Sequence, residues 1–481
     1  MGATRGHGDP SVTDKVDDPV VRAASEVIGG PRGRYAVSRE LPWVLTAALL
    51  SALTAVTAGL AVLLRAPCLR TGFTGDTQFW SACYADLPTA YRDQNVKAGV
   101  AAYLQGGDGA PVTGQPPLTG LVLTAVASLT PDDGTLKTRA AWYFAQWSVL
   151  LTLLLLVIVW LVGSSAARPV SAAHVALSPV VVLAGFISAD LLGVALASAG
   201  MWAWSRRHRT LAGVLLGLAI GARTYPVLIL VAIVLLALRA GRLREAGRTV
   251  RYALLTFGAL LSGLWLLNHG AALSPYESWV SASAGYGSPW LLPQLAGHPL
   301  PPGAVTALAA VGWLVALLVG AVLALSSARR PTLAEVSLVM VGIVLVTGKS
   351  FTVQSSVWLL PLVAWCAIQW RDHLIWAGAE ALNFVAVWLT IAATTVPDRG
   401  MPAAWYAFFS MLRVMAVLWL VAVVWLRARQ RRGVVEGSEG SEGWEGSAEG
   451  SAEGSAEGSV EVDDLAGPLA GAEDRLIVRF S

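Results

Sequence analysis

Gly75-Asp76-Thr77-Gln78-Phe79-Trp80-Ser81-Ala82-Cys83-Tyr84-Ala85-Asp86-Leu87-Pro88 lies within a long polar segment, residues 65–141, that separates two apolar runs. The segment combines carboxylates, aromatic rings and cations, whereas the apolar runs on either side of it are almost uncharged. Functional residues are often carried by loops that a rigid scaffold holds in place. We therefore expect this loop to carry the chemistry and the apolar helices to hold a substrate against it.

The composition is that of a membrane protein. Of the 481 residues, 55% are hydrophobic and 14% are charged, and the mean hydropathy is +0.60. Charged residues make up about 25% of an ordinary globular chain. Many apolar runs approach the roughly 20 residues that cross a bilayer as a helix. The sequence therefore predicts an all-α, polytopic membrane protein and excludes a soluble enzyme.

Twelve transmembrane helices are expected. They are placed at about 43–64, 142–163, 170–187, 189–204, 209–222, 225–240, 251–268, 304–325, 333–348, 355–371, 373–396 and 403–427. A further apolar run, 117–130, is short for a span and suits an interfacial or re-entrant helix. The expected divisions are a tail at 1–42, a transmembrane domain at 43–427 with large loops at 65–141 and 269–303, and a second tail at 433–481.

Arginines indicate the orientation. With twelve spans, alternate short loops hold Arg168, Arg206, Arg207, Arg209, Arg239, Arg242, Arg244, Arg248, Arg251, Arg329, Arg330, Arg371, Arg427, Arg429, Arg431 and Arg432. The short loops on the other side hold only Arg223, Lys349 and Arg399. Because positive charge marks the cytoplasmic side, we expect both termini in the cytoplasm of a plasma-membrane protein. The loops 65–141 and 269–303 then lie outside.

The second tail repeats glutamate, glycine and serine or alanine from Glu436 to Glu461. Such a sequence has too little apolar surface to fold and enough like charge to stay extended. We predict that residues 433–481 form a disordered acidic cytoplasmic tail without a catalytic role.

Two of the three cysteines, Cys68 and Cys83, fall in the outer loop, where thiols can oxidise. A disulfide between them would close a short loop and stabilise it by about 3 kcal/mol; two free thiols are the alternative. Cys366 lies in an apolar run and is expected to be a small buried hydrophobe. No histidine or further cysteine stands at ligand spacing from the pair, so no metal site is expected there.

Ionisable residues at membrane depth carry the functional information, because a charge near the bilayer centre costs about 2.5–3.5 kcal/mol. The expected topology gathers several polar residues near the outer face, beside Asp76 and Asp86: Asp190, Arg223, Lys349, Gln354 and Arg413. The set predicts a pocket of acids and cations at one membrane interface. The alternative is that the cations only end helices or pair with structural acids.

The order of the motifs adds to this interpretation. Ser188-Ala189-Asp190-Leu191-Leu192 follows the outer loop, Gly221-Ala222-Arg223-Thr224-Tyr225-Pro226 comes next, and Gly348-Lys349-Ser350-Phe351-Thr352-Val353-Gln354 comes later. Over residues 43–427 the chain resembles the GT-C membrane glycosyltransferases, in particular the actinobacterial family 87 type that uses polyprenyl-phosphate sugars. Asp86-Leu87 followed by Tyr91, and then Pro116-Pro117, is similar to the first outer loop of that family. Two departures stand out: Gln115 replaces a Tyr or Glu-Tyr, and Arg223 replaces a Lys.

The resemblance implies a GT-C-like bundle of about twelve transmembrane helices whose first outer loop contains juxtamembrane helices. It also implies an inverting transfer of a sugar, mannose in the first instance, from a polyprenyl-phosphate donor to a cell-envelope glycan or glycolipid. The departures leave the sugar open, and arabinose is the alternative. No cofactor is implied, and a divalent ion on Asp76 and Asp86 is left as an open alternative.

The resemblance assigns roles to particular residues. Asp86 is the expected general base, with Asp76 as the second choice. Arg223 and Lys349 would hold the donor phosphate, with Tyr225 and Gln354 as hydrogen-bonding neighbours. The residues expected to orient the acceptor are Asp190, Glu277 and Arg413. For Asp190 the alternative is a helix N-cap.

Other functional classes fit the sequence less well. A transporter or lipid flippase would also have many spans, but such proteins place polar residues near the midplane and show repeated halves, which this sequence does not. No phosphate-binding Gly-rich loop and no nucleic-acid-binding module is present. The expected partners are therefore the bilayer, a lipid-linked sugar and a glycan acceptor, not nucleic acid.

Overall fold

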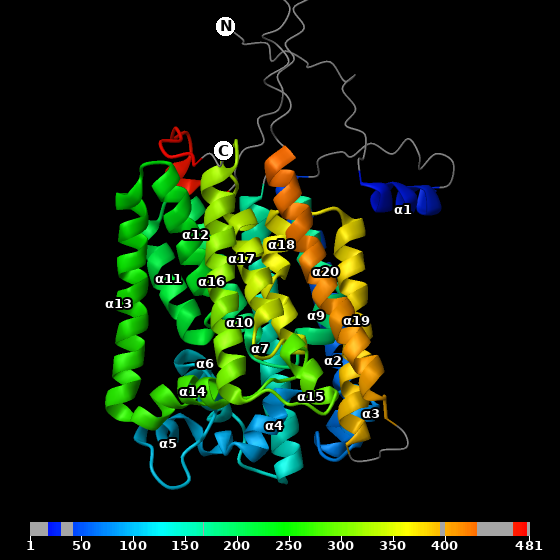
Figure 1. Ribbon diagram of the computed structural model, residues 1–481. Helices are drawn as coiled ribbons and strands as arrows, with labels where there is room; N and C mark the ends of the chain where they lie inside the picture. Colours follow the sequence, from blue (N-terminus) through cyan, green and yellow to red (C-terminus); the bar gives the residue numbers. More distant parts are fainter. Residues whose placement is uncertain (1–17, 30–41, 167, 395–399, 431–464, 479–481) are drawn as a thin grey trace, which may run out of the picture.

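The computed structural model describes residues 18–29, 42–166, 168–394, 400–430 and 465–478, and these residues form helices and loops without a strand (Figure 1). Most of the N-terminal tail, Arg399 and the repeat 436–461 lie outside the described residues. The expectation of an all-α protein is confirmed for the described part of the chain.

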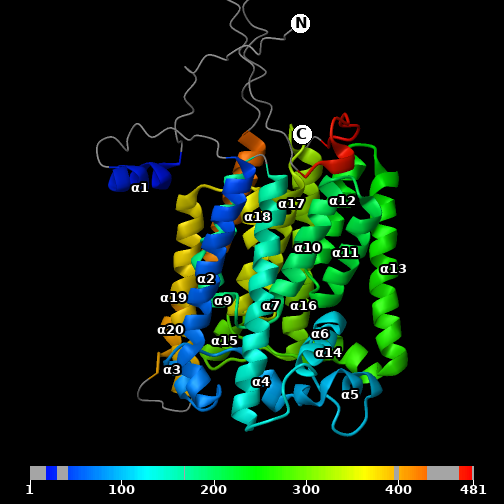
Figure 2. The same cartoon turned by 180° about the vertical axis from the view of Figure 1, so that it is seen from behind.

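Within that part, six helices are long and apolar enough to cross a membrane. They are α2 (Trp43–Thr71), α7 (Leu136–Ser165), α13 (Leu243–Leu267), α16 (Pro302–Ser326), α19 (Trp370–Ala393) and α20 (Ala403–Gln430). All six run along one common direction in Figures 1 and 2. Their length and composition are those of a membrane protein.

The other expected spans are occupied by shorter helices, so twelve full-length spans are not confirmed. These shorter helices are α8 (Ala173–Ala176), α9 (Pro179–Ala184), α10 (Asp190–Ser205), α11 (Arg209–Ala222), α12 (Pro226–Arg239), α17 (Leu333–Thr347), the 3-10 helix η5 (Val353–Trp358) and α18 (Leu360–Trp365). Prolines begin several of them, because proline lacks the amide that a helix interior requires and is tolerated in the first turn. A hydropathy average over about 20 residues does not detect these breaks, because the residues on both sides of each break are apolar.

Small helices cover one end of the bundle, which we call the loop end. From the first large loop come α3 (Thr77–Trp80), α4 (Asp86–Asp93), η2 (Val96–Ala98), α5 (Gly99–Gln105) and α6 (Pro117–Ala127); from the second come α14 (His269–Ser281), η4 (Pro289–Leu291) and α15 (Leu292–Leu295). The large loop therefore contains short helices, as expected. Cys68 and Cys83 form the expected disulfide, which joins the end of α2 to the segment before α4.

The opposite end, which we call the arginine-rich end, holds the turns at 206–209, 239–242 and 327–332. There α1 (Pro19–Gly29) lies across the direction of the spans, beside the end of α19 (Figure 1). Residues 465–478 pack against the same end and include η7 (Gly467–Leu469). The prediction of one disordered tail over 433–481 is wrong for these residues, because arginines in the turns pair with Asp474.

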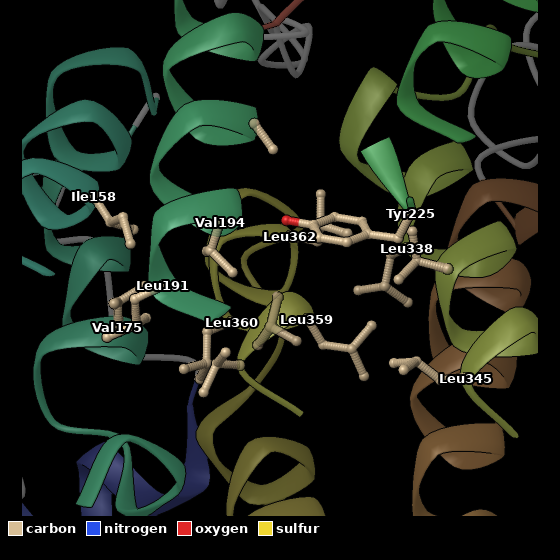
Figure 3. Close-up of a cluster of buried hydrophobic side chains, with 14 of the residues drawn as sticks. Ile158, Val175, Leu191, Val194, Tyr225, Leu338, Leu345, Leu359, Leu360 and Leu362 are labelled. Carbon is tan, nitrogen blue, oxygen red and sulfur yellow. The ribbon is translucent and has the colours of Figure 1, made fainter. Parts of the chain in front are cut away.

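Apolar side chains from distant parts of the chain meet in the middle of the bundle (Figure 3). Ile158 of α7 lies near Leu191 of α10, and Tyr225, at the start of α12, lies near Leu338 of α17. Another 3-10 helix, η3 (Pro169–Ala172), leads from α7 into the broken segment that contains α8 and α9. The packed centre holds the ends of these helices in place. The polar side chains at the loop end lie next to those helix ends.

Candidate functional site

A cavity of about 220 Å³ lies at the loop end. Most of its lining side chains are polar. The lining residues are Tyr84, Asp86, Leu87, Thr89, Ala90, Gln94, Gln115, Thr119, Leu123, Ser188, Ala189 and Arg223. They come from α4 and the residues that flank it, from α6 and the segment before it, and from two breaks between helices of the bundle.

Two helix breaks contribute residues to the cavity lining. The first is Gly185–Ala189, between α9 and α10, and buried Arg65 of α2 donates to the carbonyls of Val182 and Leu183 at 2.5 Å each. These carbonyls belong to the last turn of α9, where no helical partner follows. The second break is at Arg223, which is extended (φ −151°, ψ 150°) between α11 and Pro226.

The first large loop is fixed to both breaks. The amide of Asp86 donates to the carbonyl of Ile187 in the first break at 2.8 Å. The hydroxyl of Thr119 on α6 donates to the carbonyl of Ala222, next to the second break, at 2.8 Å. Thus α4 and α6 bring residues far apart in sequence to one cavity.

Asp86 is the carboxylate that lines this cavity. It is the first residue of α4, where the helix dipole favours a negative charge. Gln354 of η5 donates its amide Nε2 to Oδ2 of Asp86 at 3.0 Å. Burial and the nearby Asp190 raise the pKa of Asp86 to about 6, although a hydrogen bond from Tyr84 and the charge of Arg223 act against the rise. A carboxylate with this pKa can accept a proton near neutral pH.

The raised pKa predicts a pH profile. If Asp86 is the base, its unprotonated form is active, so the rate should be constant above about pH 7 and fall as the pH drops through about 6. Gln354→Met removes a donor that stabilises the carboxylate, so this limb should move to higher pH. The measurement is kcat/KM for sugar transfer between pH 4.5 and 8.5. A rate that stays flat below pH 5 contradicts the role of Asp86.

Arg223 lines the same cavity and is held by two partners. Its Nε donates to Oδ1 of Asp190 at 2.5 Å, and its Nη2 forms an ion pair with the same oxygen. Its Nη1 donates to Oε1 of Gln115 at 2.8 Å. Gly193 of α10 leaves room for this side chain, because an added Cβ would lie 3.0 Å from Cγ of Arg223. The guanidinium is therefore fixed at the edge of the cavity.

Asp190 supports this arrangement and is not an N-cap of α10 through its side chain. Its second oxygen, Oδ2, accepts from the indole Nε1 of Trp358 at 2.9 Å. Trp358 in turn stacks on Tyr225, with the ring centroids 4.7 Å apart. The carboxylate of Asp190 thus has its oxygens engaged, and it positions Arg223. Tyr225 is buried beneath this network and is not part of the cavity lining.

Arg413, expected to bind the acceptor, lies elsewhere. It is fully buried in α20 and pairs with Glu380 of α19 at 2.7 Å. Its guanidinium also donates to the carbonyls of Phe351 and Thr352 and to the hydroxyl of Ser356. These bonds hold the backbone that carries Gln354. Arg413 is therefore a structural residue that supports Gln354 from outside the cavity.

Lys349 is also placed elsewhere. Its ammonium donates to the carbonyls of Trp279 at 2.5 Å and of Val280 and Ala282 at 3.0 Å each. These carbonyls end α14, where a cation is favourable. All three donors of the ammonium are engaged, and Lys349 is not among the cavity-lining residues. In this position the ammonium of Lys349 cannot contact a donor phosphate in the cavity.

Lys349→Met is accordingly expected to affect stability and not donor binding. Loss of the buried hydrogen bonds should lower the free energy of unfolding by about 1–3 kcal/mol, measured as a lower Tm in detergent. The KM for a lipid-linked donor should change less than twofold. The exposed Lys97 at the same end offers the matched control, Lys97→Met. A tenfold rise in KM at unchanged Tm would instead restore Lys349 as a donor ligand.

Asp76 and Glu277 do not reach the cavity. Both are exposed, Asp76 before α3 and Glu277 on α14, and neither belongs to the cavity lining. Of the two candidate bases, Asp86 is therefore the one that lines the cavity.

Sequence analysis missed several lining residues. Gln94 and Thr89 carry no charge and stand in no motif, so nothing in the sequence separates them from other polar residues. Ser188 begins the motif that contains Asp190, but it was given no role. Gln115 was noted only as a departure from a family pattern, whereas it is a direct partner of Arg223. Trp358 could have been suspected from its place four residues after Gln354.

In chemical terms the cavity joins a proton acceptor, a fixed cation and neutral hydrogen-bonding groups suited to hydroxyls. Among the described residues, no group of three histidine, cysteine or acidic side chains is arranged to hold a metal ion. No protein-family model matches the chain, and no curated protein is significantly similar to it.

Proposed function

We propose that the protein is a membrane glycosyltransferase that moves one sugar from a polyprenyl-phosphate donor to a hydroxyl of a cell-envelope glycan or glycolipid. The observation that carries the proposal is that Asp86 and Arg223 line one cavity, with Gln354 bonded to the first and Asp190 to the second. A base and an anion-binding cation on one cavity are what an inverting sugar transfer requires. The GT-C-like arrangement of twelve spans belongs to the same proposal.

The size and lining of the cavity support a monosaccharide as the group transferred. Its volume of about 220 Å³ is below the roughly 300–1,000 Å³ of pockets that bury a drug-sized ligand. Hydroxyls and amides from Tyr84, Thr89, Gln94 and Gln115 offer donors and acceptors to a sugar ring. Mannose is the proposed sugar, and the choice among hexoses and pentoses is left to the assay.

Asp86 takes the proton of the acceptor hydroxyl as the hydroxyl oxygen attacks C1 of the sugar. The bond from C1 to the phosphate oxygen breaks on the opposite face, and its electron pair leaves with the polyprenyl phosphate. Arg223 stabilises the charge that develops on this phosphate. The anomeric centre is inverted, and the proton remains on Asp86 until it passes to solvent.

The orientation proposed for the protein follows from its two ends. The arginine-rich end would face the cytoplasm and the loop end the outside, by the positive-inside rule. The donor lipid would then lie in the outer leaflet of the plasma membrane, next to the cavity. Both termini would be cytoplasmic.

The test is sugar transfer by the purified full-length protein. It is incubated with polyprenyl-phosphate-mannose, then with the arabinose donor, and with a panel of envelope glycan and glycolipid acceptors. Product is detected by mass spectrometry, and its anomeric configuration by NMR. The proposal expects an inverted glycoside. Movement of the intact lipid across vesicles without any transfer would support the flippase alternative and contradict the proposal.

A further inference from the structure

Residues 465–478 occupy the arginine-rich end of the bundle, at the end opposite to α4 and α6 (Figures 1 and 2, red). Leu465 and Leu469 are each only 2% exposed. Gly467 lies directly on the end of α10: it has φ +53°, and an added Cβ would lie 2.2 Å from the carbonyl oxygen of Trp204. The segment is thus seated on the bundle by close packing.

A single carboxylate joins this segment to two arginines. Oδ2 of Asp474 accepts from Nε of Arg239 at 2.8 Å, and Oδ1 accepts from Nε of Arg330 at 2.7 Å. Arg330 also donates to the carbonyls of Leu469 and Ala472. Arg239 ends α12 and Arg330 follows α16, so Asp474 connects two helices of the bundle.

Backbone hydrogen bonds extend the contact beyond Asp474. The amides of Arg475 and Leu476 donate to the carbonyl of Arg239 at 2.8 and 3.1 Å, and the amide of Val478 donates to Leu325 at 3.0 Å. Main-chain hydrogen bonds that give affinity, together with side chains that give specificity, are a recurring mode of peptide recognition.

The charge of Arg239 explains why an acidic ligand is needed. Its side chain is fully buried and also donates to the carbonyls of Ala324 and Ala328. Carbonyls do not neutralise the charge, and Asp474 is the carboxylate that the described residues place against it. A buried charge without its partner is strongly destabilising. The site therefore selects a carboxylate.

We propose that the turns after α10, α12 and α16 form a docking site for a peptide segment that carries a carboxylate, and that residues 465–478 are its tethered ligand. Residues 431–464 connect the segment to α20. A covalent connection raises the effective concentration of a ligand at its site, so the segment competes with any peptide that is added from outside. This docking is independent of the function proposed for the cavity.

The first test uses the full-length protein and hydrogen exchange followed by mass spectrometry. Asp474→Asn removes the charge, so the amides of Arg475, Leu476 and Val478 should exchange at least tenfold faster than in the unaltered protein. The neighbouring Glu473 is exposed, and Glu473→Gln is the matched control, with unchanged exchange expected. Equal protection in the Asp474→Asn protein would contradict the proposal.

The second test asks whether the site accepts a ligand in trans. A fluorescent peptide of residues 465–481 is added to the full-length Asp474→Asn protein, whose own segment has been weakened. Saturable binding is expected, at least tenfold tighter than to the unaltered protein, where the site is filled. The same peptide with Asp474→Asn should bind at least tenfold more weakly.

The arginines of the docking site provide a second variant and its matched control. Arg330→Gln in the Asp474→Asn protein should weaken binding of the peptide at least tenfold, whereas Arg329→Gln, at an exposed neighbour, should not. Binding that ignores Asp474 and Arg330 alike, or no binding to any of these proteins, would overturn the docking site.

Discussion

Asp86→Asn is expected to lower the rate of sugar transfer by about 10²–10⁴-fold, the usual contribution of a positioned general base. The substitution keeps the shape of the side chain and an oxygen that can accept from Gln354. It removes only the ability to take a proton at a useful pKa. The KM for the donor should change little, because the proposed mechanism assigns binding of the donor to Arg223 and the neutral lining.

Asp93→Asn is the matched control. Asp93 lies on the same helix, is half exposed and pairs with the adjacent Arg92. The same chemical change there should leave the rate within about twofold, because exposed ion pairs contribute little. A full loss of transfer in Asp93→Asn with normal activity in Asp86→Asn would remove Asp86 from the mechanism.

Arg223→Gln is expected to have the second largest effect, a loss of about 10²–10³-fold in kcat, by analogy with removal of one preorganised donor at a developing negative charge. Two effects combine in this variant. On the proposed mechanism the leaving phosphate loses its cation, and the buried carboxylate of Asp190 loses the guanidinium while it keeps the hydrogen bond from Trp358. Steady-state kinetics with the lipid-linked donor measures the loss.

Arg223→Lys separates these effects, because lysine keeps the charge but not the fork that contacts Asp190 and Gln115 together. It should recover part of the lost activity. The exposed Arg70 at the same end provides the control, and Arg70→Gln should behave as the unaltered protein. A kcat in Arg223→Gln within threefold of the unaltered protein would contradict the role of this cation.

The all-helical fold could be predicted because a long apolar run is recognised from its own residues alone, without knowledge of its packing partners. The six long helices follow from apolar runs, whereas the short helices of the first large loop were expected from the family resemblance. The disulfide could be expected because Cys68 and Cys83 lie close in sequence and fall in a loop whose expected location favours oxidation. The breaks before Asp190 and after Ala222 could not, because each interrupts a run that is apolar on both sides.

The three cations predicted for the site show why the sequence alone could not identify which of them lines the cavity. Arg223, Lys349 and Arg413 all come at the expected interface, but long side chains can reach several partners. Only Arg223 faces the cavity. Lys349 instead reaches the open carbonyls at the end of α14, and Arg413 reaches Glu380, contacts that depend on the packing of separate helices.

The docked segment was missed for a different reason. The Gly- and Glu-rich repeat before it dominates the local composition, which predicts an unfolded tail. Docking rests on an ion pair between Arg239 and Asp474, residues separated by 235 positions. No local pattern carries a contact of that range.

A structure of the protein with a non-transferable polyprenyl-phosphate sugar bound would show directly whether the two halves of the cavity act on one donor. We predict that the phosphate oxygens lie at hydrogen-bonding distance, about 3 Å, from the guanidinium of Arg223, and that C1 of the sugar faces the carboxylate of Asp86. A phosphate bound beside Lys349, or a sugar held outside the cavity and away from Asp86, would contradict the proposed transfer.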